Sequence, residues 1–251
     1  MITKSDLIDI AKLKEIDNIG YAEKDYLIEL ILFLLSKNTK QELIFKGGTA
    51  LYKFYKLERF SEDLDFSEIK TINFNLLIKK ILSDLSKFKI EAKVSKIKEP
   101  FSSILATFKI KGPLYDGNPR TFSNIRIDIN RKSGVELQPS RLKLISFYTE
   151  IPSFYALVMQ EKEILAEKIR AILTRNKARD LFDAFALVEG GLEIDTKLIE
   201  KKLIYYNLKF DKGELSQAID KKEDLWIREL RPLVRELPSF ADVKKRILSL
   251  F

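Results

Sequence analysis

Residues 46–66 read KGGTALYKFYKLERFSEDLDF, a stretch in which a glycine turn is followed by closely spaced acidic residues. The preceding apolar run LIFK, 43–46, is typical of a short buried strand. TALYKFYKL, 49–57, predicts a helix that begins at Thr49, because a hydroxyl can cap free backbone N–H groups. LDFS, 64–67, alternates acidic and apolar residues as strands do. The stretch therefore predicts a strand, a glycine turn, a helix and a second strand.

Two carboxylates are expected to project from the second strand together. Asp63 and Asp65 lie two residues apart, and such residues share one face of a strand. In the run NIRIDIN, Asp128 lies on the side opposite the isoleucines, together with Arg126 and Asn130. Like charges this close repel each other unless a cation neutralises them, and carboxylate oxygens suit Mg²⁺. Adjacent strands would bring the three carboxylates into a site for Mg²⁺, with Mn²⁺ as the alternative metal.

The glycine turn is suited to holding an anion. Gly47 and Gly48 carry no side chain, so backbone N–H groups can approach a phosphate closely. A helix that follows at Thr49 would direct the partial positive charge of its N-terminus to the same place. Taken alone, Asp-x-Asp and Gly-Gly are common and usually structural. Their conjunction in this order favours phosphoryl or nucleotidyl transfer, in which catalysis rests on positioning and charge neutralisation.

Composition excludes several other chemistries. The 251 residues contain no Cys and no His, which rules out thiolate chemistry, Ser-His-Asp triads and histidine-held zinc. The net charge of +8 favours an anionic partner such as nucleic acid or nucleotide. The most apolar run, YLIELILFLL at 26–35, contains Glu29 and is too short to span a bilayer. Because no signal peptide is evident, we expect a cytoplasmic protein with no membrane partner.

The remaining pattern predicts an α+β fold in two parts. Residues 1–150 combine early helices with period-two strands, and we assign them to a mixed-sheet domain. From residue 161 the pattern is helical to the end, so 151–251 are assigned to a helical domain. The other helices expected in the first part are 4–14, 22–37 and 74–88, and its later strands are 89–97, 102–110, 124–130 and 142–150.

Two separated motifs resemble one bacterial family. KGGTAL followed by RFSEDLDFS resembles the signature of AbiE-type (AbiEii) nucleotidyltransferase toxins, within the DNA polymerase beta-like nucleotidyltransferase superfamily. That superfamily shows Gly-Ser, a helix, Asp-x-Asp and a third Asp on a later strand, and Thr49 stands here at the serine position. EKEILAEKIRAILTRNKARDLFDAFAL, 161–187, is similar to a family helix with a central Lys and a following Arg-Asp-x-x-Asp. The resemblance spans about 45–187.

The resemblance implies a nucleotidyltransferase-fold mixed sheet and a Mg²⁺-dependent enzyme that transfers NMP from a nucleoside triphosphate and releases pyrophosphate. It also implies the toxin of a toxin–antitoxin (abortive infection) system, encoded beside its antitoxin, with an RNA acceptor such as the tRNA 3′ end. The implied catalytic residues are Asp63, Asp65, Asp128, Lys168 and Asp180, of which the first three would bind the metal. The implied nucleotide-binding residues are Gly47, Gly48, Thr49, Arg59, Ser61, Lys168 and Arg175.

The second motif also has a purely structural interpretation. Lys168, Arg175 and Arg179 would fall on a narrow arc of one helix, while Asp180 and Asp183 would lie one turn apart on the next. An ordinary ion-pair network among these side chains is the alternative to nucleotide binding. The resemblance favours a functional role for Lys168 and Asp180.

Arg59 and Ser61, just before the acidic pair, have two interpretations as well. They would either hold phosphates and support the metal ligands, or tie the end of the helix to the strand. Both alternatives stay open at the level of sequence.

Two other functions fit the same residues. One is a nucleotidyltransferase whose acceptor is a protein hydroxyl or a small molecule. The other is a catalytically inactive RNA-binding module of the same fold, against which the intact set of Asp63, Asp65 and Asp128 argues.

Overall fold

The computed structural model describes residues 1–99 and 102–251. The chain forms two compact units, each assembled from several stretches of sequence. The predicted division into residues 1–150 and 151–251 stays a prediction, because compactness alone does not establish an independent domain. Unit 1 comprises Met1–Thr49, Glu62–Gly134 and Ser140–Val158, and unit 2 comprises Ala50–Ser61, Val135–Pro139 and Met159–Phe251.

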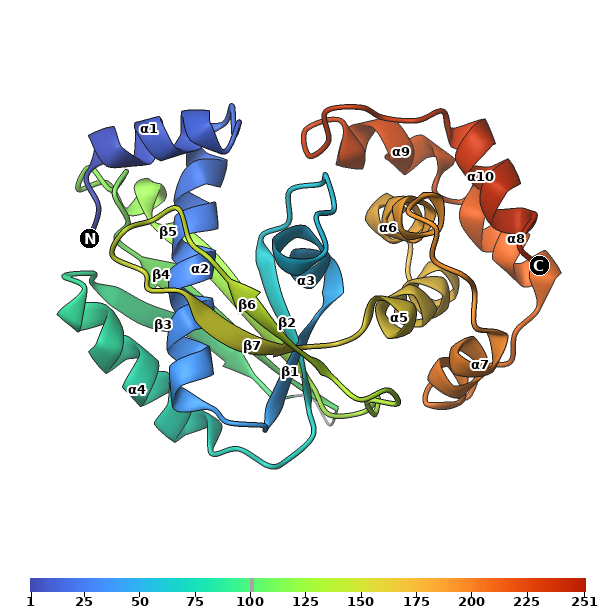
Figure 1. Ribbon diagram of the computed structural model, residues 1–251, viewed down its shortest axis with the longest axis horizontal. Coiled ribbons are helices and arrows are strands. Elements are labelled where there is room, and N and C mark those ends of the chain that lie inside the picture. The colour runs from blue at the N-terminus through green and yellow to red at the C-terminus, as the bar shows by residue number, and fades with distance from the viewer. Residues whose placement is uncertain (100–101) are drawn as a thin grey trace. The chain divides into compact units, whose positions relative to one another are not determined.

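Unit 1 contains a mixed sheet, which has seven strands in the described part of the chain, in the order β3-β4-β5-β2-β1-β7-β6 (Figure 1). The pairs β2–β5 and β1–β7 are parallel, and the other neighbours are antiparallel. With the helices described below, this sheet confirms the predicted α+β class. The strands are β1 Leu43–Lys46, β2 Asp63–Glu68, β3 Ala92–Lys98, β4 Ser103–Ile110, β5 Ser123–Asn130, β6 Ser140–Leu144 and β7 Phe154–Val158.

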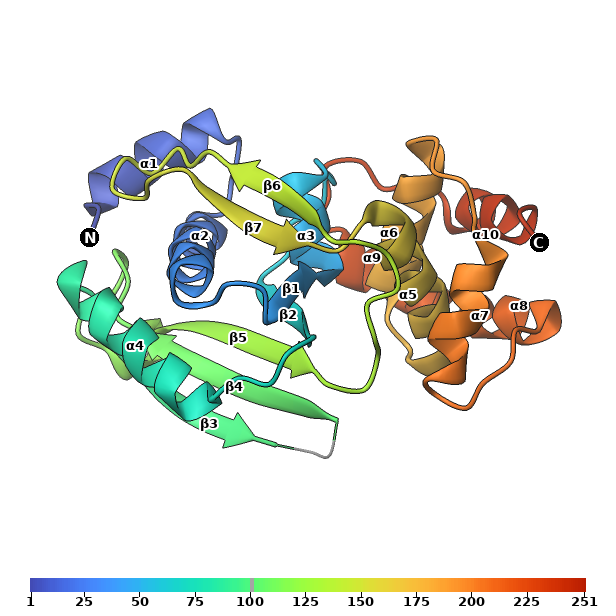
Figure 2. The same cartoon turned by 60° about the horizontal axis from the view of Figure 1, so that its bottom comes forward.

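One long helix, α2, fills the concave side of this sheet. Figure 2 shows α2 end-on, with β5 on one side and β7 on the other, and α2 contacts β2, β5 and β7. It is consequently buried around most of its circumference, which explains the apolar run at 26–35 without a membrane. The other helical segments that begin in unit 1 are α1 Lys4–Leu13, α3 Gly47–Phe54, α4 Phe74–Lys87 and the 3-10 turn η1 Pro119–Thr121, and α2 covers Ile19–Asn38.

The two faces of the sheet differ in polarity, as the alternation in NIRIDIN predicts. Ile125, Ile127 and Ile129 are at most 1% exposed. The alternate residues of β5, including Arg126 and Asp128, are exposed or half-buried. The isoleucines face the core around α2 and α4, so the polar face of β5 is available for chemistry.

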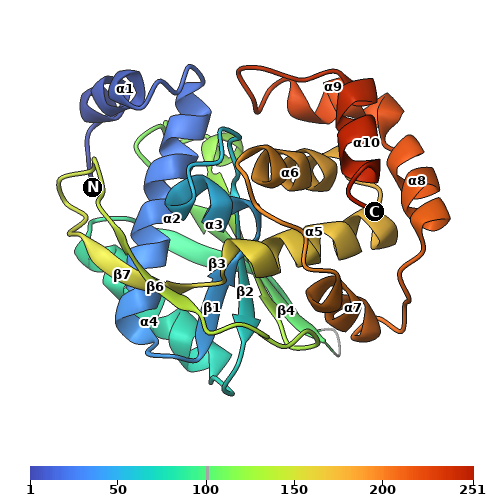
Figure 3. The same ribbon diagram turned by 45° about the vertical axis from the view of Figure 1, so that its right-hand side comes forward.

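Unit 2 is helical, as predicted from residue 161 onward. Figure 3 shows α5 and α6 side by side, and these helices make extensive contacts. Trp226 lies in the core of this unit at 3% exposure, where its indole N–H donates to the carbonyl of Pro238 at 2.9 Å. The helices are α5 Glu161–Thr174, α6 Ala178–Glu189, α7 Thr196–Ile204, α8 Lys212–Asp220, α9 Glu223–Leu230 and α10 Phe240–Leu248.

Some predicted boundaries are wrong. The helix expected to begin at Thr49 begins at Gly47, because the positive φ of Gly47 turns the chain directly out of β1. The strand expected at 142–150 ends at Leu144. Beyond it Tyr148 leaves the sheet and is fully buried, with its hydroxyl donating to Asp25 at 2.9 Å. Strand β7 was not predicted at all.

Every helix in the described residues is too short or too polar to cross a membrane.

Candidate active site

The sheet register brings two of the predicted metal ligands together. Strands β2 and β5 are parallel, and Asp65 lies directly opposite Asp128. Both side chains are half-buried on the polar face, since the residues that flank them in sequence are buried on the other side. Residues opposed in neighbouring strands project from the same face. Asp65 and Asp128 are therefore adjacent carboxylates on adjacent strands.

Asp63 is on the same face but has a different neighbour. It lies opposite Arg126, and its Oδ2 accepts a hydrogen bond from the Arg126 guanidinium. Across residues 1–99 and 102–251, no group of three or more acidic side chains has the arrangement of a metal site. The three-carboxylate metal site thus stays a prediction. The structure shows a carboxylate pair and an Asp63–Arg126 ion pair beside it.

The glycine turn packs directly against this pair. Gly47 has a φ of +77°, and a Cβ atom placed on it would lie 2.5 Å from Oδ2 of Asp65. Only glycine fits at this position, because any side chain would be strained and would collide with the carboxylate. Helix α3 starts here, so its first N–H groups lie at the same end as Asp65.

Thr49 is used differently from the expectation. It is the third residue of α3, fully buried, and its hydroxyl donates to the backbone carbonyl of Asp63. The hydroxyl therefore ties α3 to β2. Gly48 and Thr49 lie in the first turn of α3, and their part in binding a phosphate stays a prediction.

We expect Gly47→Ala to impair the site selectively. The new methyl group would overlap the Asp65 carboxylate and push it aside. Alanine would also have to adopt the left-handed backbone conformation of Gly47, which costs roughly 1–2 kcal/mol. Transfer activity should fall at least about tenfold, while Gly191→Ala, at an exposed glycine of unit 2 that also has a positive φ but open space around it, should leave activity unchanged. Equal rates in both variants would contradict this role of Gly47.

Lys46 also lies next to Asp65, and it was not among the residues predicted from the sequence. Lys46, the last residue of β1, lies opposite Asp65 in the antiparallel β1–β2 pairing and is only 7% exposed. A lysine is almost never buried unless it has a partner. The signal was its position at the end of an otherwise apolar strand, directly before Gly47.

The second motif forms a buried charge network in unit 2. Lys168 Nζ lies 3.0 Å from an oxygen of Asp180 and 2.7 Å from an oxygen of Asp183. Arg59 donates to both oxygens of Asp183, at 2.6 and 2.9 Å, and Arg175 donates to both oxygens of Asp180, at 2.7 and 2.8 Å. Each aspartate is thus shared between Lys168 and an arginine.

The charges of this network reinforce one another. Burial alone would lower the pKa of Lys168, but the carboxylates of Asp183 and Asp180 outweigh it and raise that pKa. Burial works to raise the pKa of Asp180 and of Asp183, and the neighbouring cations overcome it and hold both below their ordinary value. All three groups are therefore charged at neutral pH.

Several residues that were predicted to bind the nucleotide lie in or next to this network. Arg59 is 2% exposed and also donates to the carbonyl of Phe60. This burial favours the structural interpretation of Arg59 over a role in phosphate binding. Ser61, two residues further along the chain, is buried as well. The expectation that Lys168, Arg175 and Arg179 share one helix is wrong, because α5 ends at Thr174 and α6 starts at Ala178. Arg175 is instead the residue that follows α5, in an extended conformation.

Comparison with solved structures defines the class of fold. The chain is similar to the nucleotidyltransferase toxin MenT4 from Mycobacterium tuberculosis, with a TM-score of 0.64 and 20% identity over 100% of this chain and 89% of that chain. It is also similar to JHP933 from Helicobacter pylori, with a TM-score of 0.59 and 19% identity over 92% of this chain and 89% of that chain. The fold is therefore that of nucleotidyltransferase toxins, as the resemblance implied.

The family follows from the sequence itself. The family model described as nucleotidyl transferase AbiEii toxin, type IV toxin–antitoxin system, matches residues 30–246. The chain belongs to this AbiEii family, and it is a nucleotidyltransferase and a toxin of the type IV class. Such a protein uses a nucleoside triphosphate and has a cognate antitoxin. No protein among the curated ones matches the chain.

Proposed function

We propose that this toxin transfers NMP from a nucleoside triphosphate to the terminal hydroxyl of an RNA, with the 3′ end of tRNA as the favoured acceptor. The attacking oxygen of the RNA forms a bond to the α-phosphorus, and the bond from that phosphorus to the bridging oxygen breaks, which releases pyrophosphate. The observation that carries the proposal is the pairing of Asp65 with Asp128 beside the glycine turn. The net charge of +8 supports a polyanionic acceptor.

The side chains around the pair suit a divalent cation. Nucleotidyl transferases generally use divalent metals, and the donors of Asp65 and Asp128 are carboxylate oxygens on one face, which fit Mg²⁺. Asp65 and Asp128 would hold the ion, and Asp63 would join them by exchanging its contact with Arg126. A bound Mg²⁺ ion would neutralise phosphate charge as a Lewis acid. Mn²⁺ has the same preference for oxygen ligands and is the alternative.

The chain's own groups supply the other contributions. The backbone N–H groups of Gly48 and Thr49 would bind the β- and γ-phosphates at the start of α3. Asp128 would accept the proton of the attacking hydroxyl. In unit 2, Lys168 would contact the nucleotide or its phosphates, and Asp180 would keep it charged and in place.

Labelling experiments test this function. We would incubate the protein with each α-³²P nucleoside triphosphate in turn, with Mg²⁺ and total cellular RNA and protein. The proposal expects label at the 3′ end of tRNA, and it expects no incorporation of label when EDTA is present from the start to chelate the divalent ion. Label on protein would contradict the RNA acceptor and support a protein hydroxyl as the acceptor. If no label is transferred but RNA still binds, the protein would be the catalytically inactive binding module.

A further inference from the structure

The polar face of the sheet continues well beyond the carboxylates. Along β5, Arg126 and Asn124 alternate with buried residues and are exposed on the same face as Asp128. Phe122 comes two residues before Asn124 in an extended conformation, so it lies at the far end of the same line. At about 3.3 Å per residue, Phe122 is roughly 20 Å from Asp128. A continuous polar track thus runs from the proposed catalytic pair to an aromatic side chain.

That aromatic side chain is part of a small stacking platform. The rings of Phe122 and Tyr115 lie 4.9 Å apart between centroids, and both residues are half-buried. Lys93 Nζ is 5.9 Å from the centre of the Phe122 ring, and Lys111 Nζ is 5.3 Å from that of Tyr115. Half-exposed aromatic rings flanked by lysines are the combination that binds unpaired nucleotides, since every base has a face to stack.

The loop that carries Tyr115 is held in place from both sides. Glu23 of α2 is 5% exposed and accepts a hydrogen bond from the N–H of Leu114 at 2.7 Å. The carboxylate of Asp116 accepts from the N–H of Asn118 at 2.9 Å and from the hydroxyl of Thr121 at 2.7 Å. The platform therefore has a defined position before any ligand binds, which lowers the entropic cost of binding.

Lysines border the track on its outer side. Across the antiparallel strands, Lys96 lies opposite Thr107, which lies opposite Arg126, so the three share one face. Lys93 lies in the same way opposite Lys109, the partner of Asn124. Lysines at such spacing neutralise the phosphates of a strand that follows the track.

We propose that this face, from Phe122 and Tyr115 along β5 to Asp128, binds the single-stranded 3′ end of the acceptor RNA. The terminal hydroxyl would lie at Asp128, an upstream base would stack on Phe122, and Lys93, Lys96 and Lys109 would contact the backbone. Because the stacking surface needs an unpaired base, the structure favours a single strand over a duplex. The direction of the RNA strand in this inference, with its 3′ end at Asp128, rests on the proposed function. The existence of the binding surface does not.

Direct binding measurements test the surface. We would measure the dissociation constant of a short fluorescein-labelled single-stranded RNA by fluorescence anisotropy at several salt concentrations. Phe122→Ala should weaken binding roughly five- to one-hundred-fold, and Phe122→Tyr should retain it, since the ring is what stacks. Lys96→Gln should lower the slope of log affinity against log salt by about 0.7.

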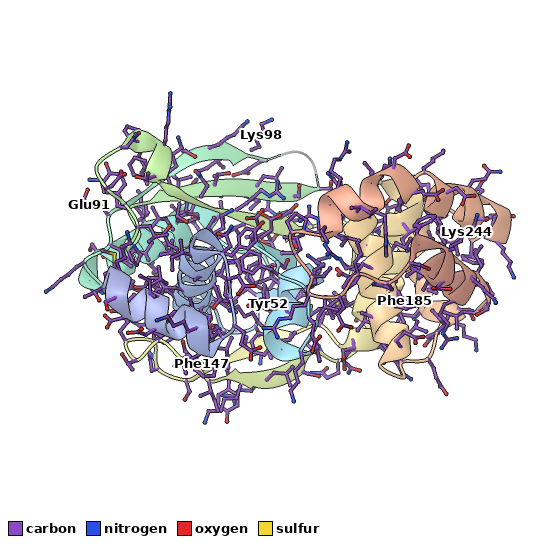
Figure 4. The ribbon with its side chains drawn as sticks, turned by 90° about the horizontal axis from the view of Figure 1, so that it is seen from above. Tyr52, Glu91, Lys98, Phe147, Phe185 and Lys244 are labelled. Atoms are coloured by element: carbon purple, nitrogen blue, oxygen red, sulfur yellow. The ribbon has the colours of Figure 1, made fainter. Side chains whose placement is uncertain are left out.

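Matched controls come from the opposite edge of the same unit. Phe147 is an exposed aromatic residue, and Figure 4 shows it on the side of unit 1 opposite Lys98. Lys143 is an exposed lysine on the edge strand β6. Phe147→Ala and Lys143→Gln should bind RNA as the wild type does. Thermal unfolding of each variant checks that the fold is intact, and Phe122→Tyr separates lost stacking from lost structure.

The outcomes for the surface and for the reaction are separable. Unchanged RNA binding by Phe122→Ala and Lys96→Gln, or equal losses in the controls, overturns the inference even if the wild type labels RNA. Selective losses support the inference even if no label is transferred, in which case only the proposed reaction fails. Binding of Mg²⁺ and nucleoside triphosphate, measured by calorimetry, should be the same in all these variants.

Discussion

Asp65→Asn should slow NMP transfer by about a thousandfold or more while the protein keeps its fold. The substitution preserves the size of the side chain next to Gly47 but removes the charge and one strong oxygen donor. Loss of several kcal/mol of charge stabilisation in the transition state corresponds to this factor. Initial rates of label incorporation at saturating nucleoside triphosphate measure it. Asp128→Asn should cost at least as much, since it would also lose the proton acceptor.

Asp9→Asn is a suitable control for both variants. Asp9 lies on α1 in the same unit, its side chain is 68% exposed, and its ion pair with Lys12 is long, at 3.7 Å. It should transfer NMP at the wild-type rate. If Asp65→Asn stayed within a few-fold of that rate, the carboxylate pair would not be the catalytic centre.

Asp183→Ala should destabilise the protein by about 3–5 kcal/mol. The variant deprives two buried cations of a carboxylate: Arg59, which donates to both of its oxygens, and Lys168, at 2.7 Å. Removing one partner of a buried ion pair leaves an uncompensated charge, and this penalty is what the experiment detects. Unfolding in urea, followed by fluorescence, measures the loss. The chain has a single Trp, at position 226 in the core of unit 2, so the signal reports on the affected unit.

The matched substitution is Glu189→Ala on the same helix. Its ion pair with Arg246 is exposed, with both side chains more than two-fifths accessible, so its loss should cost at most about 1 kcal/mol. A loss as small as this in Asp183→Ala would mean that water or other side chains compensate the network.

Local patterns predicted the strands better than their partners. The alternation in NIRIDIN correctly placed Asp128, Arg126 and Asn130 on one face, because the period of a strand is two whatever its neighbours are. Which residue opposes Asp63 depends on register, and register follows from the packing of the whole sheet. The Asp63–Arg126 pair was therefore beyond the reach of the sequence.

Other features could not be predicted because the segment is too short or because its partners are too far apart in the chain. Strand β7, FYALV, is five residues long, and such a short apolar run cannot be told from other buried segments by its periodicity. Arg59 and Asp183 are 124 residues apart in the chain, so no spacing rule could have paired them. The Lys168–Asp180 contact, by contrast, spans twelve residues and lies within the motif that the family resemblance had marked.

The interleaving of the two units constrains how the protein can be made. Arg59 leaves the ribosome long before Asp183 is translated, so the nascent chain carries a guanidinium whose carboxylate partner does not yet exist. Residues 50–61 and 135–139 must likewise wait for 159–251 before they can join their unit. Assembly of that unit is thereby deferred until residues 159–251 have been translated, and a toxin of this architecture stays incomplete until then.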